Sequence, residues 1–228
     1  MNSLLWTLWI SLRISLLATA LVMVVGLPLA WMLSRPRWKA KGLLDVAVNL
    51  PLVLPPTVVG YYLLLLMSRG GPVGALTQRL WGASLIFTPT AAVLASAVLG
   101  LPLFVQAARN ALEGVPPEAY EAAQIDGADR WSAIRRIYIP LAWPGIWTGL
   151  LLAYARSLGE FGATIMVAGN IPGKTQTMSL AIYSAVQAGH DSAANLLSLI
   201  LTAVASFSMW VGLRWRNPAR ARRGGGSP

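Results

Sequence analysis

Two ionisable residues inside an apolar stretch are the first candidates for chemistry in this sequence. Arg156 and Glu160 are four residues apart in the segment 142–168, which is mostly apolar and long enough for a helix. Residues at this spacing share one helix face, so the side chains can form an ion pair. A charged group inside a membrane costs about 2.5–3.5 kcal/mol and usually faces a bundle interior or a cavity. The pair therefore either packs helices together or acts as a gate in which Arg156 attracts an anion.

A second candidate site surrounds three prolines in the stretch 51–60, "PLVLPPTVVG". Proline removes a backbone donor, and membranes tolerate the resulting kink where neighbours or a water-lined cavity satisfy the freed carbonyls. We expect a broken helix beside a pathway in preference to an ordinary packing kink. Pro55, Pro56 and Thr57 are then pathway candidates. Thr57 and Thr164 could bind an anion through their hydroxyls, or could make ordinary helix–helix hydrogen bonds.

A third stretch, "AGNIPGKT" at 168–175, fits the loose phosphate-loop pattern. Such a loop needs a preceding strand, a following helix and an acidic residue for magnesium. Here the loop follows an apolar span, and acidic residues are few and dispersed. We therefore expect no nucleotide site in this chain.

The most polar stretch is "EAAQIDGADRWSAIRRIYIP" at 121–140, within the otherwise apolar chain. Two prolines before Glu118 mark a helix start, and Glu118 and Glu121 fall in the first turn, where the helix dipole favours acids. Gly127 is a typical residue for ending a helix, which predicts a short helix over 118–126. Asp129 can then cap a second helix.

The short helix has two interpretations. A basic amphipathic linker between spans can lie on lipid headgroups. The stretch "EAAQIDG" is instead small-residued and nearly neutral, which suits insertion into a protein cleft. A helix this short needs tertiary contacts, and we expect a partner protein to provide them.

The composition identifies a membrane protein. The 228 residues are 56% hydrophobic and 11% charged, with a mean hydropathy of +0.59. Soluble domains are nearer a quarter charged. A bilayer span needs about 20 mostly apolar residues. Stretches of that length predict five spans, at 4–33, 43–67, 85–108, 142–168 and 191–213.

The placement of charge predicts the orientation of these spans. The net charge is +10, and its basic residues gather in alternate loops. Loops rich in Lys and Arg face the cytoplasm, so the N-terminus is predicted outside and the C-terminus inside. Without a stacking platform the charge does not indicate nucleic acid, and contact with anionic lipid fits better. The clusters are Arg35, Arg37, Lys39 and Lys41 after the first span, Arg109, Arg130, Arg135 and Arg136 after the third, and Arg214, Arg216, Arg220, Arg222 and Arg223 after the fifth.

We expect one transmembrane domain over 1–215, including the cytoplasmic segment 116–140, and a basic disordered tail over 216–228. The glycines at 159–173 predict a bend at the end of the fourth span, and the loop 169–190 can hold a short helix. Gly145 and Gly149 favour close helix packing. With no cysteine, the chain has neither a disulfide framework nor a thiolate metal site.

One motif of the polar stretch is similar to a known family signature. It consists of Glu121-Ala122-Ala123, Gly127, Ile137 and Ile139-Pro140. This pattern resembles the EAA signature of ABC importer permeases, with Ile139 where leucine is usual. The segments 50–66, 95–115 and 155–185 resemble the permease subunits of molybdate importers. Sulfate and thiosulfate permeases are similar around "LGEFGA".

The resemblance implies an all-α polytopic bundle, the type I ABC importer permease fold, with about five transmembrane helices and a short cytoplasmic coupling helix. It implies a homodimer in the bacterial plasma membrane that works with two cytoplasmic ATPase subunits and an extracytoplasmic oxyanion-binding protein. ATP and magnesium would be bound by the ATPase subunits, and this chain would hold no cofactor. The residues expected to contact the ATPase are Glu118, Glu121, Ala122, Ala123, Asp126 and Gly127.

Other functions remain to be weighed against a molybdate permease. The substrate could be tungstate, sulfate or thiosulfate. A secondary transporter would need inverted repeats and its own ion site, and the sequence shows neither. An intramembrane enzyme would need paired carboxylates, an activated nucleophile or metal ligands, which one Arg and one Glu do not supply. A purely structural scaffold fits less well with the proline-broken second span.

Overall fold

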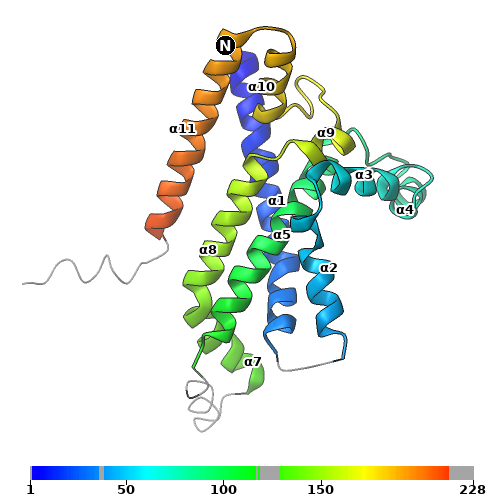
Figure 1. The fold of residues 1–228 in the computed structure, drawn as a ribbon. Helices are drawn as coiled ribbons and strands as arrows, with labels where there is room; N and C mark the ends of the chain where they lie inside the picture. The colour runs from blue at the N-terminus through cyan, green and yellow to red at the C-terminus, as the bar shows by residue number, and fades with distance from the viewer. Residues whose placement is uncertain (1, 36–38, 117, 119–128, 216–228) are drawn as a thin grey trace, which may run out of the picture.

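A computed structural model of the chain describes residues 2–35, 39–116, 118 and 129–215 (Figure 1). Regular structure in these ranges is helical throughout. The elements are α1 (Asn2–Ser34), α2 (Lys41–Val53), α3 (Pro56–Met67), α4 (Pro72–Trp81), α5 (Pro89–Glu113), α7 (Arg130–Ala133), the π-helical turn η1 (Ile134–Tyr138), α8 (Ile139–Leu158), α9 (Gly162–Ala168), α10 (Met178–Gln187) and α11 (Asp191–Trp215).

The core of the bundle is made by α1, α5 and α8, which lie side by side (Figure 1). Small residues allow α5 and α8 to approach closely, as is usual where lipid supplies no hydrophobic driving force between helices. A Cβ on Gly149 would lie 3.1 Å from the Cβ of Ala107 and from the ring of Phe104, and a Cβ on Gly145 would lie only 2.4 Å from the Cβ of Ala111. The expected role of the glycine pair in close packing is confirmed.

Within the described residues, helices lie at all five predicted spans, but the bounds of the third and fourth differ from the prediction. Four are long and apolar enough to cross a membrane: α1, α5, the continuous helix Ile134–Leu158 and α11. The pair α2 and α3, bent by 116°, makes a fifth span if the two helices are counted together. The predicted third span is shifted toward the C-terminus, because Thr88 caps α5 by accepting a hydrogen bond from the N–H of Ala91.

The predicted fourth span, 142–168, was wrong as a single helix. The helix begins earlier, ends at Leu158, and is followed after a break by the short helix α9. The predicted bend in the glycine-rich segment is therefore confirmed at its first glycine, Gly159. The predicted short helix in the loop 169–190 is α10, whose first turn is capped by Thr177.

The basic residues gather at one end of the bundle. The end of α1, the start of α2, the end of α5 and α7 lie at this end, opposite the N-terminus and α10, and α11 runs toward it but stops short (Figure 1). We call it the basic end, and the other the α10 end. Described basic residues at the basic end are Arg35, Lys39, Lys41, Arg109, Arg135 and Arg136.

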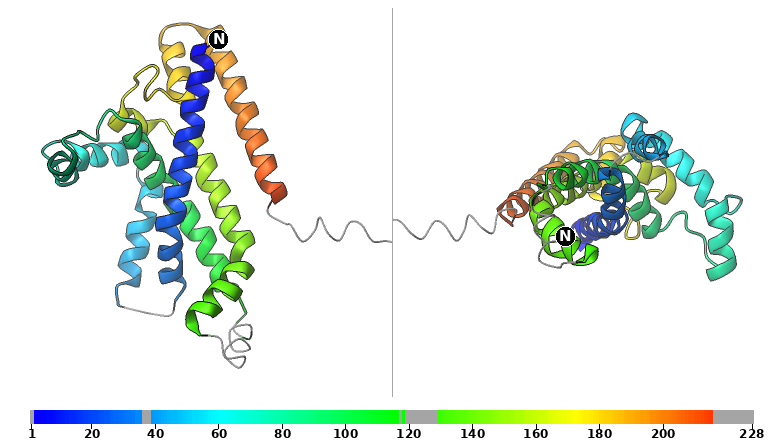
Figure 2. Two further views of the ribbon diagram at one scale, coloured as in Figure 1. Left: turned by 180° about the vertical axis from the view of Figure 1, so that it is seen from behind. Right: turned by 90° about the horizontal axis from the view of Figure 1, so that it is seen from below.

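The break between α2 and α3 sends the chain sideways. Leu54 is extended (ψ 142°) and so is Pro55 (ψ 138°), and Pro56 is the first residue of α3. A residue before proline is sterically pushed out of the α conformation, so the two consecutive prolines explain the break. As a result, α3 and α4 project laterally from the bundle (Figure 2).

Candidate pathway and coupling sites

Arg156 and Glu160 form an ion pair where α8 gives way to α9. Nη1 of Arg156 donates to Oε2 of Glu160, and Oε1 of Glu160 accepts the N–H of Ala163 at 2.8 Å. Glu160 is 2% exposed, so its carboxylate is buried with both oxygens in use. A buried charge is tolerated when it is paired and hydrogen-bonded, and a carboxylate also suits the positive N-terminal end of a helix.

The breaks in the second and fourth spans meet. A Cβ on Gly162 would lie 3.1 Å from the Cβ of Pro56 and 3.4 Å from Cγ2 of Thr57, so the first turns of α3 and α9 are in contact. Gly60 packs against the backbone of Ala163 one turn further along. We call residues 54–57 and 159–164 the break junction. Meeting ends of discontinuous helices are where membrane transporters commonly place substrate sites.

The predicted pathway residues divide by exposure. Pro55 and Thr57 are exposed, and the side chain of Arg156 is 29% exposed. Glu160 and Thr164 are buried, at 2% and 1%, so neither offers a surface to a ligand in this conformation. The predicted pathway residues thus come from the second and the fourth predicted spans, which meet at the break junction. The side chain of Arg156 is partly exposed, whereas the carboxylate of Glu160 is buried.

The predicted coupling helix lies mostly outside the described residues. Glu121, Ala122, Ala123, Asp126 and Gly127 are among those not described. Glu118 is described, and it is helical and exposed. The segment's position between α5 and α7 places its flanks at the basic end (Figure 1).

The second predicted helix of the polar stretch is confirmed. Oδ1 of Asp129 accepts the N–H of Ser132 at 3.3 Å, as expected of a helix cap. The helix continues through the π turn η1 into α8, so the described part of the polar stretch from Arg130 on is continuous with the helix that carries Arg156. The π turn was not predicted. Such turns inside α-helices frequently occur at functional sites.

The π turn is attached to the end of α1 by aromatic and cationic contacts. The rings of Tyr138 and Trp31 meet edge to face with centroids 5.3 Å apart. The guanidinium carbon of Arg35 lies 3.8 Å from the centroid of the Trp31 ring. Such cation–π contacts add attraction beyond the area that they bury. The segment after the predicted coupling helix is therefore fixed to α1 as well as to α8.

The stretch that fits the phosphate-loop pattern is a hydrogen-bonded turn between α9 and α10. A helix precedes it where a phosphate loop requires a strand. The hydroxyl of Thr175 accepts the N–H of Ile171 at 3.1 Å, lies 3.4 Å from the carbonyl oxygen of Gly169, and is fully buried. That hydroxyl is therefore committed to the turn.

Among the described residues, no group of three or more His, Cys, Asp or Glu side chains is arranged to hold a metal ion.

Residues 15–218 match the model of the family described as "Binding-protein-dependent transport system inner membrane component". The chain belongs to this family, whose members are the non-catalytic transmembrane components of ABC importers.

Individual relatives show which kinds of permease the chain is similar to. The chain is 44% identical over 216 residues to the molybdenum transport system permease protein ModB of Escherichia coli strain K12, covering 94% of both proteins. It is 36% identical over 181 residues to the sulfate transport system permease protein CysT of the same organism, covering 79% of this chain and 65% of that one. Its fold is similar to a chain of the MetNI methionine ABC transporter solved in an inward-facing conformation, with a TM-score of 0.75, 19% identity, and coverage of 95% and 96%.

Proposed function

We propose that this chain is the membrane-spanning permease subunit of an ATP-driven importer of molybdate. The observation that carries the proposal is the 44% identity to a molybdenum permease along 94% of both chains. Similarity to a sulfate permease is lower and covers less of either protein. Tungstate has the same tetrahedral shape and charge as molybdate, so it is the second substrate to test.

Two copies of the chain would face each other across the pathway, because five spans from one copy leave little room for an enclosed route. The break junction would line that route. Arg156 supports this role because part of its side chain is exposed while Glu160 is enclosed, so a passing dianion meets the cation and not the carboxylate. Thr57 and Pro55 would contribute exposed surface opposite it. Thr164 would support the junction from within.

The basic end would face the cytoplasm, where the segment 116–140 would dock one ATPase subunit. Closure of the ATPase dimer on ATP would move the docked segment, and the continuous helix through η1 and α8 would carry that movement toward the junction. The α10 end would face outward and receive molybdate from a binding protein. Loop charge supports this orientation.

The test is reconstitution of the full chain in liposomes with candidate ATPase subunits and oxyanion-binding proteins. We expect ATP-dependent uptake of molybdate, with ATP hydrolysis stimulated by the molybdate-loaded binding protein. Parallel assays with tungstate and sulfate measure selectivity. Uptake of sulfate alone would overturn the assigned substrate. Uptake that persists after ATP depletion, while a proton gradient remains, would instead identify a secondary transporter.

A further inference from the structure

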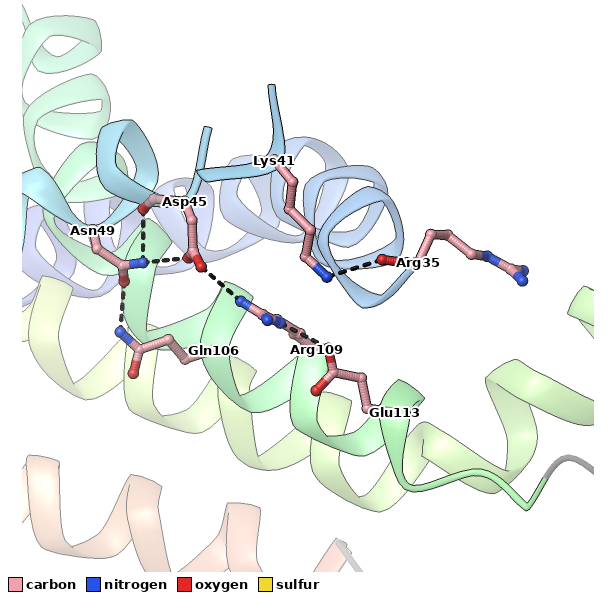
Figure 3. A network of polar contacts seen from close by, with 7 residues as sticks. All are labelled: Arg35, Lys41, Asp45, Asn49, Gln106, Arg109 and Glu113. Atoms are coloured by element: carbon pink, nitrogen blue, oxygen red, sulfur yellow. Dashed lines mark hydrogen bonds and ion pairs between the residues drawn. The ribbon is translucent and has the colours of Figure 1, made fainter. Parts of the chain in front are cut away.

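Four polar side chains connect α2 to α5 at the basic end (Figure 3). Nη1 of Arg109 on α5 donates to Oδ2 of Asp45 on α2 at 2.9 Å. One turn further into the bundle, Nε2 of Gln106 donates to Oδ1 of Asn49 at 2.6 Å. Asn49 in turn donates to Oδ1 of Asp45 at 2.9 Å. We call Asp45, Asn49, Gln106 and Arg109 the α2–α5 ladder.

The ladder matters because α2 has little apolar packing of its own. Within α2, all of which the structure describes, only Val48 is buried, whereas Leu43 and Val53 are 75% and 80% exposed. The helix contacts α5 and, more lightly, α1. A single ion pair with this exposure contributes little. Two bonds to α5, linked to each other by a third bond within α2, are therefore a large share of what fixes the position of a helix with one buried side chain.

The two helices that the ladder joins lead to the two candidate sites. Helix α5 ends at Glu113, just before the segment 116–140 that contains the predicted coupling helix. Helix α2 ends at Val53, just before the break, and α3 then contacts Gly162. The ladder therefore bridges the part of the chain that would receive motion and the part that would use it.

We propose that Asp45 and Arg109 are positioning residues for transport, a role that rests on the function proposed above. Their bond makes α2 follow α5, so that movement of the coupling segment reaches the break junction through α2 as well as through α8. Neither residue contacts the transported anion in this role.

The chain offers a matched control for this bond. Nε of Arg109 also donates to Oε1 of Glu113 at 2.9 Å, one turn away on the same helix. The side chains of Asp45 and Glu113 are 37% and 40% exposed. Asp45→Ala and Glu113→Ala therefore remove the same charge and one bond to the same arginine. Only the first substitution removes a bond between two helices.

The experiment measures molybdate taken up per ATP hydrolysed by the full complex in liposomes. We expect Asp45→Ala to lower this ratio by about fivefold, the factor that corresponds to a favourable partly exposed pair. Glu113→Ala should leave the ratio within about twofold of the wild type. In a Glu113→Gln background, Asp45→Arg combined with Arg109→Glu restores a reversed pair and should recover the ratio that either change alone lowers.

A distance measurement gives a readout that needs no substrate. Spin labels at Leu43 on α2 and Asn110 on α5, both exposed, report whether the two helices move together. We expect one narrow distance distribution in the nucleotide-free and ATP-bound complex, and a broadened or shifted one after Asp45→Ala.

Three results would overturn the ladder's role. One is a wild-type label distance that changes when ATP binds. Another is an equal uptake ratio in the Asp45→Ala and Glu113→Ala variants. The third is a loss of uptake and hydrolysis in strict proportion to the amount of assembled complex, which would indicate a folding role alone. A wild-type complex that takes up no molybdate would instead contradict the proposed function, and the label distances would still test the ladder.

Discussion

Two polar bonds near the break junction and the α10 end are buried, although the bond from Trp6 to Gly173 there is exposed, whereas the ion pair that joins α2 to α5 at the basic end is partly exposed. Ser11 on α1 accepts the N–H of Met178 on α10 at 2.7 Å in a buried position. Glu160 caps α9 from within the protein. At the basic end, by contrast, Arg109 and Asp45 keep 25% and 37% of their side chains exposed.

This difference predicts that the break junction and the α10 end are rigid and that the basic end moves more easily. Buried hydrogen bonds are strong in a low dielectric and costly to break, so they define a rigid region. Segments with few buried apolar contacts and exposed polar bonds open at lower cost. This division suits the proposed function, in which the basic end receives the motion of the ATPase. We therefore expect changes at the basic end to impair coupling, and changes at the junction to impair folding.

The largest expected effect at the basic end is on binding of the ATPase subunit. Glu121→Ala should weaken assembly with the ATPase by about 2–5 kcal/mol, because a charged partner group is left unpaired in the interface. The thermal unfolding midpoint of the isolated chain should stay near that of the wild type. Co-purification and uptake measure the first effect, and unfolding in detergent measures the second. Glu113→Ala is the control acid. Normal assembly and normal uptake in the Glu121 variant would contradict the docking model.

At the junction, Glu160→Leu should destabilise the chain itself. The change leaves Arg156 unpaired and removes the cap of Ala163, at a cost of about 2–4 kcal/mol; the exposed part of Arg156 keeps the cost below that of a fully buried pair. Glu160→Gln keeps a cap acceptor and should cost less. The double change with Arg156→Leu should recover part of the loss. Unfolding midpoints of the four proteins provide the test, and a wild-type midpoint for Glu160→Leu would refute the idea.

Two glycine substitutions compare the regions directly. A Cβ on Gly60 would lie 2.7 Å from Cα of Ala163, so Gly60→Ala forces α3 away from α9 and should cost about 1–3 kcal/mol. A Cβ on Gly42, in the first turn of α2, would meet nothing within 4 Å. Gly42→Ala should be neutral or should stabilise by up to about 1 kcal/mol through helix propensity. Equal unfolding midpoints for the two variants would remove the contrast between the regions.

The sequence predicts the breaks in the second and fourth spans, but it does not predict that the two breaks contact each other. Consecutive prolines and a glycine cluster are local signals, so the bends at Pro55 and Gly159 can be read from the chain. The contact of Gly162 with Pro56 and Thr57 joins segments about a hundred residues apart, and no local pattern encodes it. Polar residues near the ends of spans are misleading for a related reason. The sequence indicates only a topology signal at Arg109, because a basic residue near the headgroups has the same local pattern whether it faces lipid or a neighbouring helix.

The smallest expected effect concerns the aromatic attachment of the π turn. Trp31→Leu removes contacts with Tyr138 of η1 and with Arg35 directly after α1, and should cost about 1–2 kcal/mol. Trp210 is the matched control, because Arg214 lies 4.1 Å from the centroid of its ring but both residues belong to α11.

If the attachment transmits motion, Trp31→Leu should lower uptake per ATP hydrolysed while Trp210→Leu leaves that ratio unchanged, even when both variants unfold at similar temperatures. A contact within one helix can stabilise that helix, but it cannot make two elements move together. Equal ratios of uptake to ATP hydrolysis in the two variants would mean that η1 transmits motion through α8 alone. The α2–α5 ladder and the helix Ile134–Leu158 would then join the basic end to the break junction without a contribution from α1.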